Sequence, residues 1–194
     1  MRLSGCALLS KIGRSIILTH SAGSIPAFLI SDNCPQYVAA SINFEPGSVP
    51  FQDLTGNTRR PSRPWGLADV PITYSPAVSD PSEIKTSSVG VDTPAKRACI
   101  LQVAPARKLP NIAKVPYLAL TGQASIFDTY VYCIVDFLRQ AGVSADYIRL
   151  GDVGVRGNAH FGFEEKNNLQ IARVIQDWIQ TRLSGLSNES NVTS

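Results

Sequence analysis

The stretch Ser15-Ile-Ile-Leu-Thr-His-Ser-Ala-Gly23 decides the fold of this 194-residue chain. An apolar run that favours β structure, Ser15–Thr19, leads directly into His20-Ser21-Ala22-Gly23, and a helix-compatible segment follows. This order predicts a strand, a sharp turn with a serine at its apex and a helix, which is the arrangement of a nucleophile elbow. The usual pattern is Gly-x-Ser-x-Gly, and here Thr19 stands in place of the first glycine.

The remaining periodicity predicts strands and helices in alternation. Besides Ser15–Thr19, strands are expected over Tyr37–Phe44, Val115–Thr121 and Tyr147–Leu150, and helices over Leu3–Ile12, Gly23–Ser31, Tyr130–Ala141 and Leu169–Leu183. Alternation of this kind is typical of the α/β class, with a parallel sheet between helices. We expect about four parallel strands in chain order, with Ser15–Thr19 at one edge.

Residues 46–114 are long, irregular and rich in proline, which is typical of either a functional lid or a disordered segment. Phe51, Trp65 and Tyr74 are spread through the segment and favour an ordered cap. We therefore expect one partial domain over residues 1–185, with 46–114 as a cap-like insertion over the mouth of the site and 186–194 as a flexible tail. Phe51 and Trp65 either line an apolar pocket there or pin the cap to the domain.

Composition excludes several classes of protein. Hydrophobic residues make up 44% of the chain and charged residues 17%, which is typical of a globular domain, and a net charge of +3 is too small to indicate a nucleic-acid partner. No apolar run is long enough to span a bilayer. Lys11 and Arg14 interrupt the apolar N-terminus, so we do not interpret it as a signal peptide, and localisation stays open.

The four cysteines do not form a metal-binding or redox pattern. Their sequence contains no Cys-x-x-Cys pair, and each lies in apolar surroundings, so we expect buried thiols. An even number also allows one or two disulfides, but the sequence favours no pairing among Cys6, Cys34, Cys99 and Cys133. No metal or other cofactor is expected.

The elbow and a distant histidine suggest acyl-transfer chemistry. Ser21 is the candidate nucleophile, and the backbone N–H of Ala22, at the start of the following helix, is the candidate oxyanion donor. His20 is a poor base for Ser21 because adjacent side chains diverge at the turn. His160 lies in a glycine-rich loop after the last expected strand, where this order of motifs places the general base.

The carboxylate that would orient His160 has more than one candidate. Glu45 directly follows the strand after the elbow, and Asp128 lies beyond the next strand of the expected sheet. Both positions are at carboxyl ends of strands, where α/β folds place their chemistry. Asp128 precedes a helix and could equally serve as a favourable charge at its N-terminus. Asp152 is a weaker third choice.

Longer stretches resemble a known family of α/β-hydrolases. The runs THSAG, INFEPGSVPF, PWGLADVPITY, ARKLPNIAKVPYLALTGQAS and GDVGVRGNAHFGFEEKNNLQIARVIQDWI are similar to the bacterial "esterase 713"-type enzymes and related fungal serine esterases. The resemblance covers about Leu8 to Ile179 and implies that Ser21 is the nucleophile, Glu45 the acid and His160 the base. The chain departs from the family pattern at Phe161-Gly162, where many relatives carry bulkier residues such as methionine, so the resemblance does not predict the shape of the acyl pocket.

The same resemblance implies that part of the usual fold is absent. Only residues 1–14 precede the elbow strand, whereas α/β-hydrolases place several strands and a second oxyanion donor before the nucleophile. We therefore interpret the chain as the C-terminal part of an α/β-hydrolase fold, truncated before the elbow. It is either a serine hydrolase of small carboxylic esters, weakened by this loss, or a non-catalytic remnant that at most binds a ligand. The exposed edge strand favours self-association.

Overall fold

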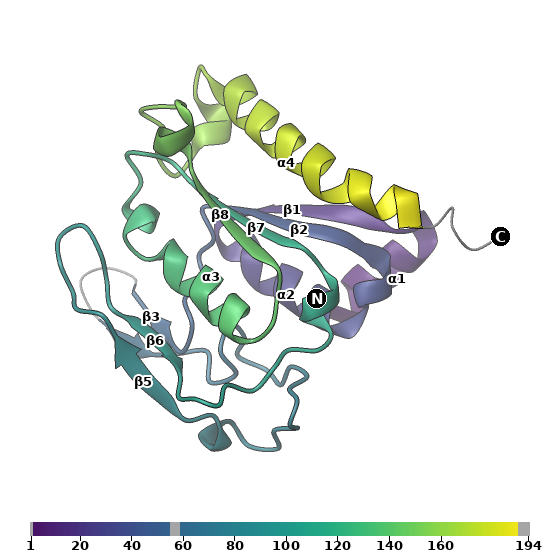
Figure 1. Ribbon diagram of the computed structural model, residues 1–194, viewed down its shortest axis with the longest axis vertical. Helices are drawn as coiled ribbons and strands as arrows, with labels where there is room; N and C mark the ends of the chain where they lie inside the picture. The colour runs from purple at the N-terminus through teal and green to yellow at the C-terminus, as the bar shows by residue number, and fades with distance from the viewer. Residues whose placement is uncertain (1, 55–58, 190–194) are drawn as a thin grey trace.

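A computed structural model describes residues 2–54 and 59–189 and has a four-stranded parallel sheet at its centre (Figure 1). The strands lie in the order β1-β2-β7-β8, and all three neighbouring pairs are parallel. Their bounds are Ser15–His20 (β1), Val38–Phe44 (β2), Tyr117–Thr121 (β7) and Ala145–Arg149 (β8). The prediction of a parallel α/β sheet in chain order, with the elbow strand at one edge, is confirmed.

Helices cover both faces of this sheet. Helices α2 (Ser24–Asn33) and α3 (Val131–Gln140) lie on one face, and the long helix α4 (Asn168–Glu189) crosses the other (Figure 1). Helix α1 (Arg2–Ile12) packs against α2 beside the edge strand. The helices predicted from sequence are present, with ends shifted by a few residues. Helix α4 includes the first residues of the 186–194 segment, and the last five residues lie outside the described part of the chain.

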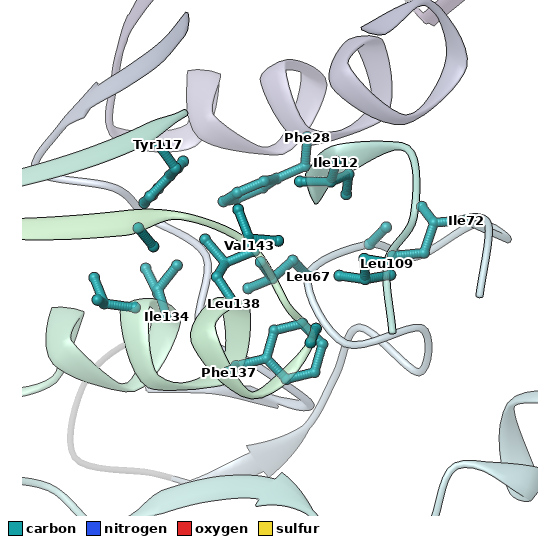
Figure 2. Close-up of a cluster of buried hydrophobic side chains, with 14 of the residues drawn as sticks. Phe28, Leu67, Ile72, Leu109, Ile112, Tyr117, Ile134, Phe137, Leu138 and Val143 are labelled. Atoms are coloured by element: carbon teal, nitrogen blue, oxygen red, sulfur yellow. The ribbon is translucent and has the colours of Figure 1, made fainter. Parts of the chain in front are cut away.

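Alternation along the central strands builds two hydrophobic layers. Tyr117 and Ala119 of β7 face the cluster beneath α2 and α3, whereas Leu118 and Leu120 face the cluster beneath α4. Figure 2 shows the first layer, in which Phe28 of α2 lies near Tyr117 and the Ile134 and Leu138 side chains of α3 point toward the sheet. Because β7 is buried on both faces, its sequence is largely apolar from Tyr117 to Leu120, as expected for a central parallel strand.

The described part of segment 46–114 packs against α3 and carries two short hairpins. The strands are β3 (Gln52–Asp53) with β4 (Arg60–Pro61), and β5 (Thr86–Val89) with β6 (Cys99–Gln102). Its buried side chains join the core layer beneath α3; they include Trp65, Leu67, Ile72, Tyr74, Ile84, Leu109 and Ile112. Aromatic and aliphatic burial of this extent explains how a segment with little regular structure adopts a fixed path.

The two aromatic side chains considered as pocket residues pack in the interior instead. Trp65 is 7% exposed within the core, and the Phe51 ring meets the Phe137 ring edge-on at 5.5 Å between centroids. Of the described residues, those that line the cavity beside Ser21 do not include either ring. The structure therefore favours the second alternative, in which Phe51 and Trp65 fix the segment to the domain.

The cysteines form two disulfides, so the expectation of four buried thiols is wrong. Cys6 of α1 is bonded to Cys34 at the end of α2, and Cys99 of β6 is bonded to Cys133 of α3. The sequence separations are 28 and 34 residues, so tertiary folding rather than local spacing brings the sulfurs together. The second bridge ties the 46–114 segment directly to the helix that packs on the sheet.

Removal of the Cys99–Cys133 bridge should destabilise the protein strongly. Closing a loop of 34 residues restricts the unfolded chain by about 3 to 4 kcal/mol in the chain-entropy account. We expect the Cys99→Ala/Cys133→Ala variant to melt roughly 10 °C below the wild type in a thermal unfolding scan. The Cys6→Ala/Cys34→Ala variant serves as a matched comparison for a loop of similar length. An unchanged melting temperature on treatment with a reductant would show that the bridges do not form.

Strand β1 leaves one side of the sheet open. Leu18 is 59% exposed there, and an apolar groove runs beside it between β1 and α4, lined in part by Phe44, Phe163 and Ile171. An open apolar edge can pair with another strand, which is the physical basis of the expected self-association. Among the described residues, no helix is long and apolar enough to cross a membrane.

Candidate functional site

The elbow forms as the sequence indicates. Strand β1 ends at His20, the 3₁₀ turn Ser21–Gly23 follows, and α2 begins at Ser24. Ser21 adopts a positive φ of 54°, a left-handed conformation that is uncommon for a residue with a side chain and is typical of strained functional turns. The Thr19 side chain lies against Gly23 and donates a hydrogen bond to Asn43 Oδ1 at 2.6 Å, so the threonine is accommodated in the elbow.

Glu45 leaves the sheet beside Ser21. His20 and Phe44 are register partners, so the residues that follow them emerge next to each other at the carboxyl edge. Glu45 also has a positive φ, 53°, and its side chain is fully buried. Its Oε1 accepts a 2.6 Å hydrogen bond from the Gly122 N–H, and its Oε2 accepts a short one from the Ser125 hydroxyl.

Burial has a large effect on the ionisation of Glu45. Loss of solvent raises the pKa of the Glu45 carboxyl to about 7, although the hydrogen bonds from Ser125 and Gly122 act in the opposite direction. The negative charges of Asp128 and Glu165 raise the pKa further. A carboxyl group in this state lies near the midpoint of its titration at neutral pH, which is common at functional sites and rare elsewhere.

His160 lies next to this carboxyl group. Its Nδ1 is 3.6 Å from Glu45 Oε2 and has no hydrogen-bond partner among the described residues, so the contact is close but is not a formed hydrogen bond. Burial and the neighbouring His20 lower the pKa of His160 below its usual 6.5, so the imidazole is neutral at pH 7. Because the ring is neutral, the 3.6 Å approach of Nδ1 to Glu45 Oε2 is not an ion pair.

Two rings hold the His160 imidazole in place. The Phe127 ring stacks on it with centroids 4.3 Å apart and an interplanar angle of 15°, and the His20 ring lies 4.4 Å away. His20 Nε2 also donates a 2.8 Å hydrogen bond to the His160 carbonyl oxygen. His20, set aside as a base, thus acts on the backbone of the candidate base.

A polar network fixes the loop that carries His160. Asn158 is fully buried, and its Nδ2 donates to Glu165 Oε2 at 2.6 Å and to Asn167 Oδ1 at 2.7 Å. Asn167 returns a bond to Asn158 Oδ1, and the Ala159 N–H donates to Glu165 Oε1. This network gives a physical reason for the Gly-Asn-x-His and Lys-Asn-Asn segments, because the side-chain amides of Asn158 and Asn167 each donate a hydrogen bond to the other.

The other candidate acids have different partners. Asp128 accepts hydrogen bonds from Arg149 Nε at 2.8 Å, from Arg149 Nη2, and from the hydroxyls of Tyr147 and Thr121. Although burial alone would raise it, these bonds hold the pKa of Asp128 below its ordinary value. Asp152 is largely exposed and lies 3.5 Å from Arg149 Nη1. Both carboxylates are thus engaged by Arg149.

Two contributors to the site were not anticipated from sequence. Ser125 donates to Glu45, and Phe127 stacks on His160; both belong to the turn at the start of η5 (Ile126–Thr129), where the Ser125 hydroxyl also accepts from the Phe127 N–H. A weak signal existed, because the loop after β7 leaves the same edge of the sheet as Glu45. Nothing in the sequence pattern distinguished these two residues from others in that loop.

A cavity of about 510 Å³ opens beside Ser21 and Ala22. The turn after β2 supplies one side through Gly47 and Val49, and the turn after β7 supplies another through Ile126 and Phe127. Gly47 approaches the elbow closely, since its N–H donates to the Ser21 carbonyl at 3.0 Å and a side chain there would lie 3.1 Å from the Ala22 nitrogen. The described residues contain no cluster of His, Cys, Asp or Glu suited to a metal ion.

The Gly122→Ala substitution should disrupt the site without replacing any of its candidate catalytic residues. An added methyl group at residue 122 would lie 2.2 Å from the Asn158 carbonyl oxygen, in the loop that carries His160. The loop must then shift, and a displacement of about 1 Å typically costs about 10²-fold in rate. We expect at least that loss in ester hydrolysis. Gly151→Ala, where the nearest atoms belong to the flexible Gln123 side chain, is the matched control and should retain activity.

Comparisons with known proteins find similarities to a probable lipase and to solved esterase structures. No family model matches it. It is 36% identical over 175 residues to a probable secreted lipase of Fungal sp. (strain ATCC 74256), and the match covers 90% of this chain and 48% of that protein. The chain therefore spans about half the length of the curated relative that it matches.

Solved structures agree on the fold. The structure of a novel bacterial esterase is similar with a TM-score of 0.54 and 20% identity, covering 91% of this chain and 41% of that one. A pyrethroid hydrolase is similar with a TM-score of 0.50 and 15% identity, covering 94% and 76%. The chain thus shares the α/β fold of these hydrolases, as the sequence predicts, over about 41% of the esterase chain and 76% of the pyrethroid hydrolase chain.

Proposed function

Because the chain is a relative of α/β-hydrolase esterases and lipases, we propose that it is a serine hydrolase of carboxylic esters. The observation that carries the proposal is that a serine elbow, a buried glutamate and a histidine lie at the same edge of the sheet. A serine in a strained elbow lies beside a buried glutamate, and that glutamate lies 3.6 Å from the Nδ1 atom of a neutral histidine. The adjoining cavity gives an ester room to reach the serine.

The proposed reaction proceeds through an acyl-enzyme. His160 Nε2 accepts the hydroxyl proton of Ser21 as the oxygen attacks the ester carbonyl, and the Ala22 N–H stabilises the oxyanion that forms. The imidazolium then protonates the departing alcohol. Water, deprotonated by His160, releases the acid and restores Ser21. Glu45 faces Nδ1, where a carboxylate stabilises the imidazolium in each half of the cycle.

Two features support an oxidising compartment as the place of action. Disulfides persist mainly in secreted proteins, and the structure has two of them. The curated relative is described as secreted. We include secretion in the proposal on these grounds.

A second candidate function is that of a non-catalytic binding module. One observation favours it: within the described residues, no hydrogen bond connects the Ser21 hydroxyl with the His160 ring. Such contacts are often loose without a substrate, so the first candidate is the stronger.

Labelling with a fluorophosphonate separates the two candidates. An activated serine displaces fluoride and keeps the phosphonyl group, whereas an ordinary serine does not react. We expect a single adduct that mass spectrometry maps to Ser21, not to the neighbouring Ser24, and that disappears in a His160→Ala variant. A folded chain that remains unlabelled would overturn the hydrolase proposal in favour of the binding module.

A further inference from the structure

Part of the cavity wall consists of polar groups that the proposed reaction does not use. Gln52, Arg63 and Arg97 line the same cavity as Ser21. Gln52 is 1% exposed, yet among the described residues neither its amide nitrogen nor its amide oxygen has a hydrogen-bond partner. The Nε atom of Arg63 is likewise buried without one. Buried polar groups are almost always paired, so two neighbouring lining residues that each carry an unpartnered donor indicate a place for a ligand.

The backbone holds Gln52 and Arg63 together at considerable conformational cost. The Phe51 N–H donates to the Gly66 carbonyl, and the Ser62 N–H donates to the Phe51 carbonyl, so the two turns are tied to each other. Arg63 Nη1 then donates to the Gln52 carbonyl at 3.3 Å. Phe51 and Arg63 both have positive φ, 60° and 49°, conformations that residues with side chains rarely adopt outside functional sites.

The charge of the wall is positive. Arg63 and Arg97 form no ion pair with a carboxylate in the described part of the chain. Asp53 also lines the cavity, but it has an interaction partner of its own. The remaining lining is largely apolar, with Val49, Leu54 and Ile126 among it. A guanidinium group beside an amide in such surroundings presents several N–H donors to an anionic oxygen.

We propose that Arg63 and Gln52 form a subsite for a carboxylate, so that the preferred substrate is an ester that also carries a free carboxylate a few bonds from the scissile group. This inference rests on the proposed function, since it names the substrate class of the same site. The Arg63 guanidinium and the Gln52 amide N–H donate to the carboxylate, which gives the unpartnered donor atoms Arg63 Nε and Gln52 Nε2 an acceptor. The apolar part of the cavity accommodates the intervening methylene groups.

Two pairs of matched esters test the subsite from both sides of the scissile bond. On the acyl side, mono-p-nitrophenyl glutarate is compared with p-nitrophenyl pentanoate; on the alcohol side, 5-acetoxypentanoate is compared with pentyl acetate. In each pair a carboxylate replaces a methyl group. After subtraction of the enzyme-free rate, we expect kcat/KM to favour the carboxylate in at least one pair by about tenfold or more. No preference in either pair would overturn the inference.

Variants identify the groups responsible. Arg63→Met and the nearly isosteric Gln52→Glu should each lower the preference ratio about tenfold, because one removes the cation and the other adds a repelling charge. Arg173→Met, which removes an exposed arginine of α4 far from the cavity, should leave the ratio unchanged. Ratios that stay constant in both cavity variants, with folding verified by circular dichroism, would contradict the assignment.

A binding measurement separates this inference from the proposed function. Monoethyl glutarate and ethyl pentanoate are titrated calorimetrically into Ser21→Ala, which cannot turn them over. Tighter binding of the glutarate, lost on adding Arg63→Met, supports the subsite even if the wild type hydrolyses no ester. Equal binding of the two ligands, in a wild type that does hydrolyse esters, refutes the subsite and leaves the hydrolase proposal standing.

Discussion

The Ser21→Ala variant should lose all hydrolysis of a short-chain aryl ester, a fall of at least about 10³-fold from the wild-type chain. Without the hydroxyl group no acyl-enzyme can form, and nothing else in the proposed reaction supplies a nucleophile. The substitution removes a single oxygen atom at a partly exposed turn, so the fold should persist. The measurement is the release of p-nitrophenol by purified protein, with the enzyme-free rate subtracted.

Among the described residues, the Ala22 N–H is the oxyanion donor that we assign, and no strand pairs with the outer side of β1. Ser21 is therefore supported by β2 on one side, and we expect a modest wild-type rate. Equal hydrolysis by wild type and Ser21→Ala would disprove the nucleophile assignment. Fast turnover by a monomer would mean that a second donor comes from elsewhere in the chain.

The sequence predicted the sheet well because the relevant signals are local. Short apolar runs that end in turn residues define each strand, and chain order with parallel connections leaves little freedom in the arrangement. The elbow was readable for the same reason, since its strand, turn and helix lie within Ser15–Asn33. The partners of Ser21 were harder to predict. The residues alone left Glu45 and Asp128 as competing candidates for the acid that orients His160, and only the family resemblance favoured Glu45.

What the sequence did not indicate depends on contacts between distant segments. The disulfides join residues 28 and 34 positions apart, and no local pattern specifies either pairing. The Ser125 hydroxyl meets Glu45 across 80 positions of sequence. The Gln52 amide is buried without a hydrogen-bond partner at a place where backbone hydrogen bonds join two turns of the 46–114 segment. Such features follow from packing of irregular segments, for which hydrophobic periodicity carries no information.

Glu45→Gln tests the assignment of the acid with a change of one atom. The amide oxygen can still accept from the Gly122 N–H, and the amide nitrogen can donate to the Ser125 hydroxyl, so both partners of Glu45 are kept. What disappears is the negative charge that stabilises the His160 imidazolium. The comparable change in a serine protease triad lowers kcat by about 10⁴-fold, and we expect a loss of about 10³ to 10⁴.

Asp128→Asn is the matched control for this loss. It makes the same chemical change in the competing carboxylate, whose partner is Arg149 rather than His160. We expect kcat to remain within about tenfold of wild type, with the main effect on stability through the weakened contacts to Arg149 and Tyr147. A larger loss of kcat in Asp128→Asn than in Glu45→Gln would reverse the assignment of the acid.

The same Glu45→Gln variant should be more stable than the wild type at high pH. Burial raises the pKa of Glu45 from 4.5 to about 7, so the folded state binds a proton that the unfolded state has released. The stability that this group contributes is therefore present below pH 4.5 and is lost as pH rises toward 7. A shift of this size corresponds to about 3 kcal/mol. Glutamine cannot ionise and does not lose this stability. Urea denaturation should therefore give similar free energies of unfolding for the variant and the wild type at pH 4.5, and a difference of about 3 kcal/mol between them at pH 8.

Equal free energies of unfolding at both pH values would show that Glu45 ionises without penalty in the fold. A variant less stable than wild type at pH 8 would show that the Glu45 carboxylate is a favourable charge in the fold. Glu45→Gln is therefore expected to lower activity and to raise stability at high pH. The ionised form of Glu45 destabilises the fold, but the same form stabilises the His160 imidazolium during the reaction.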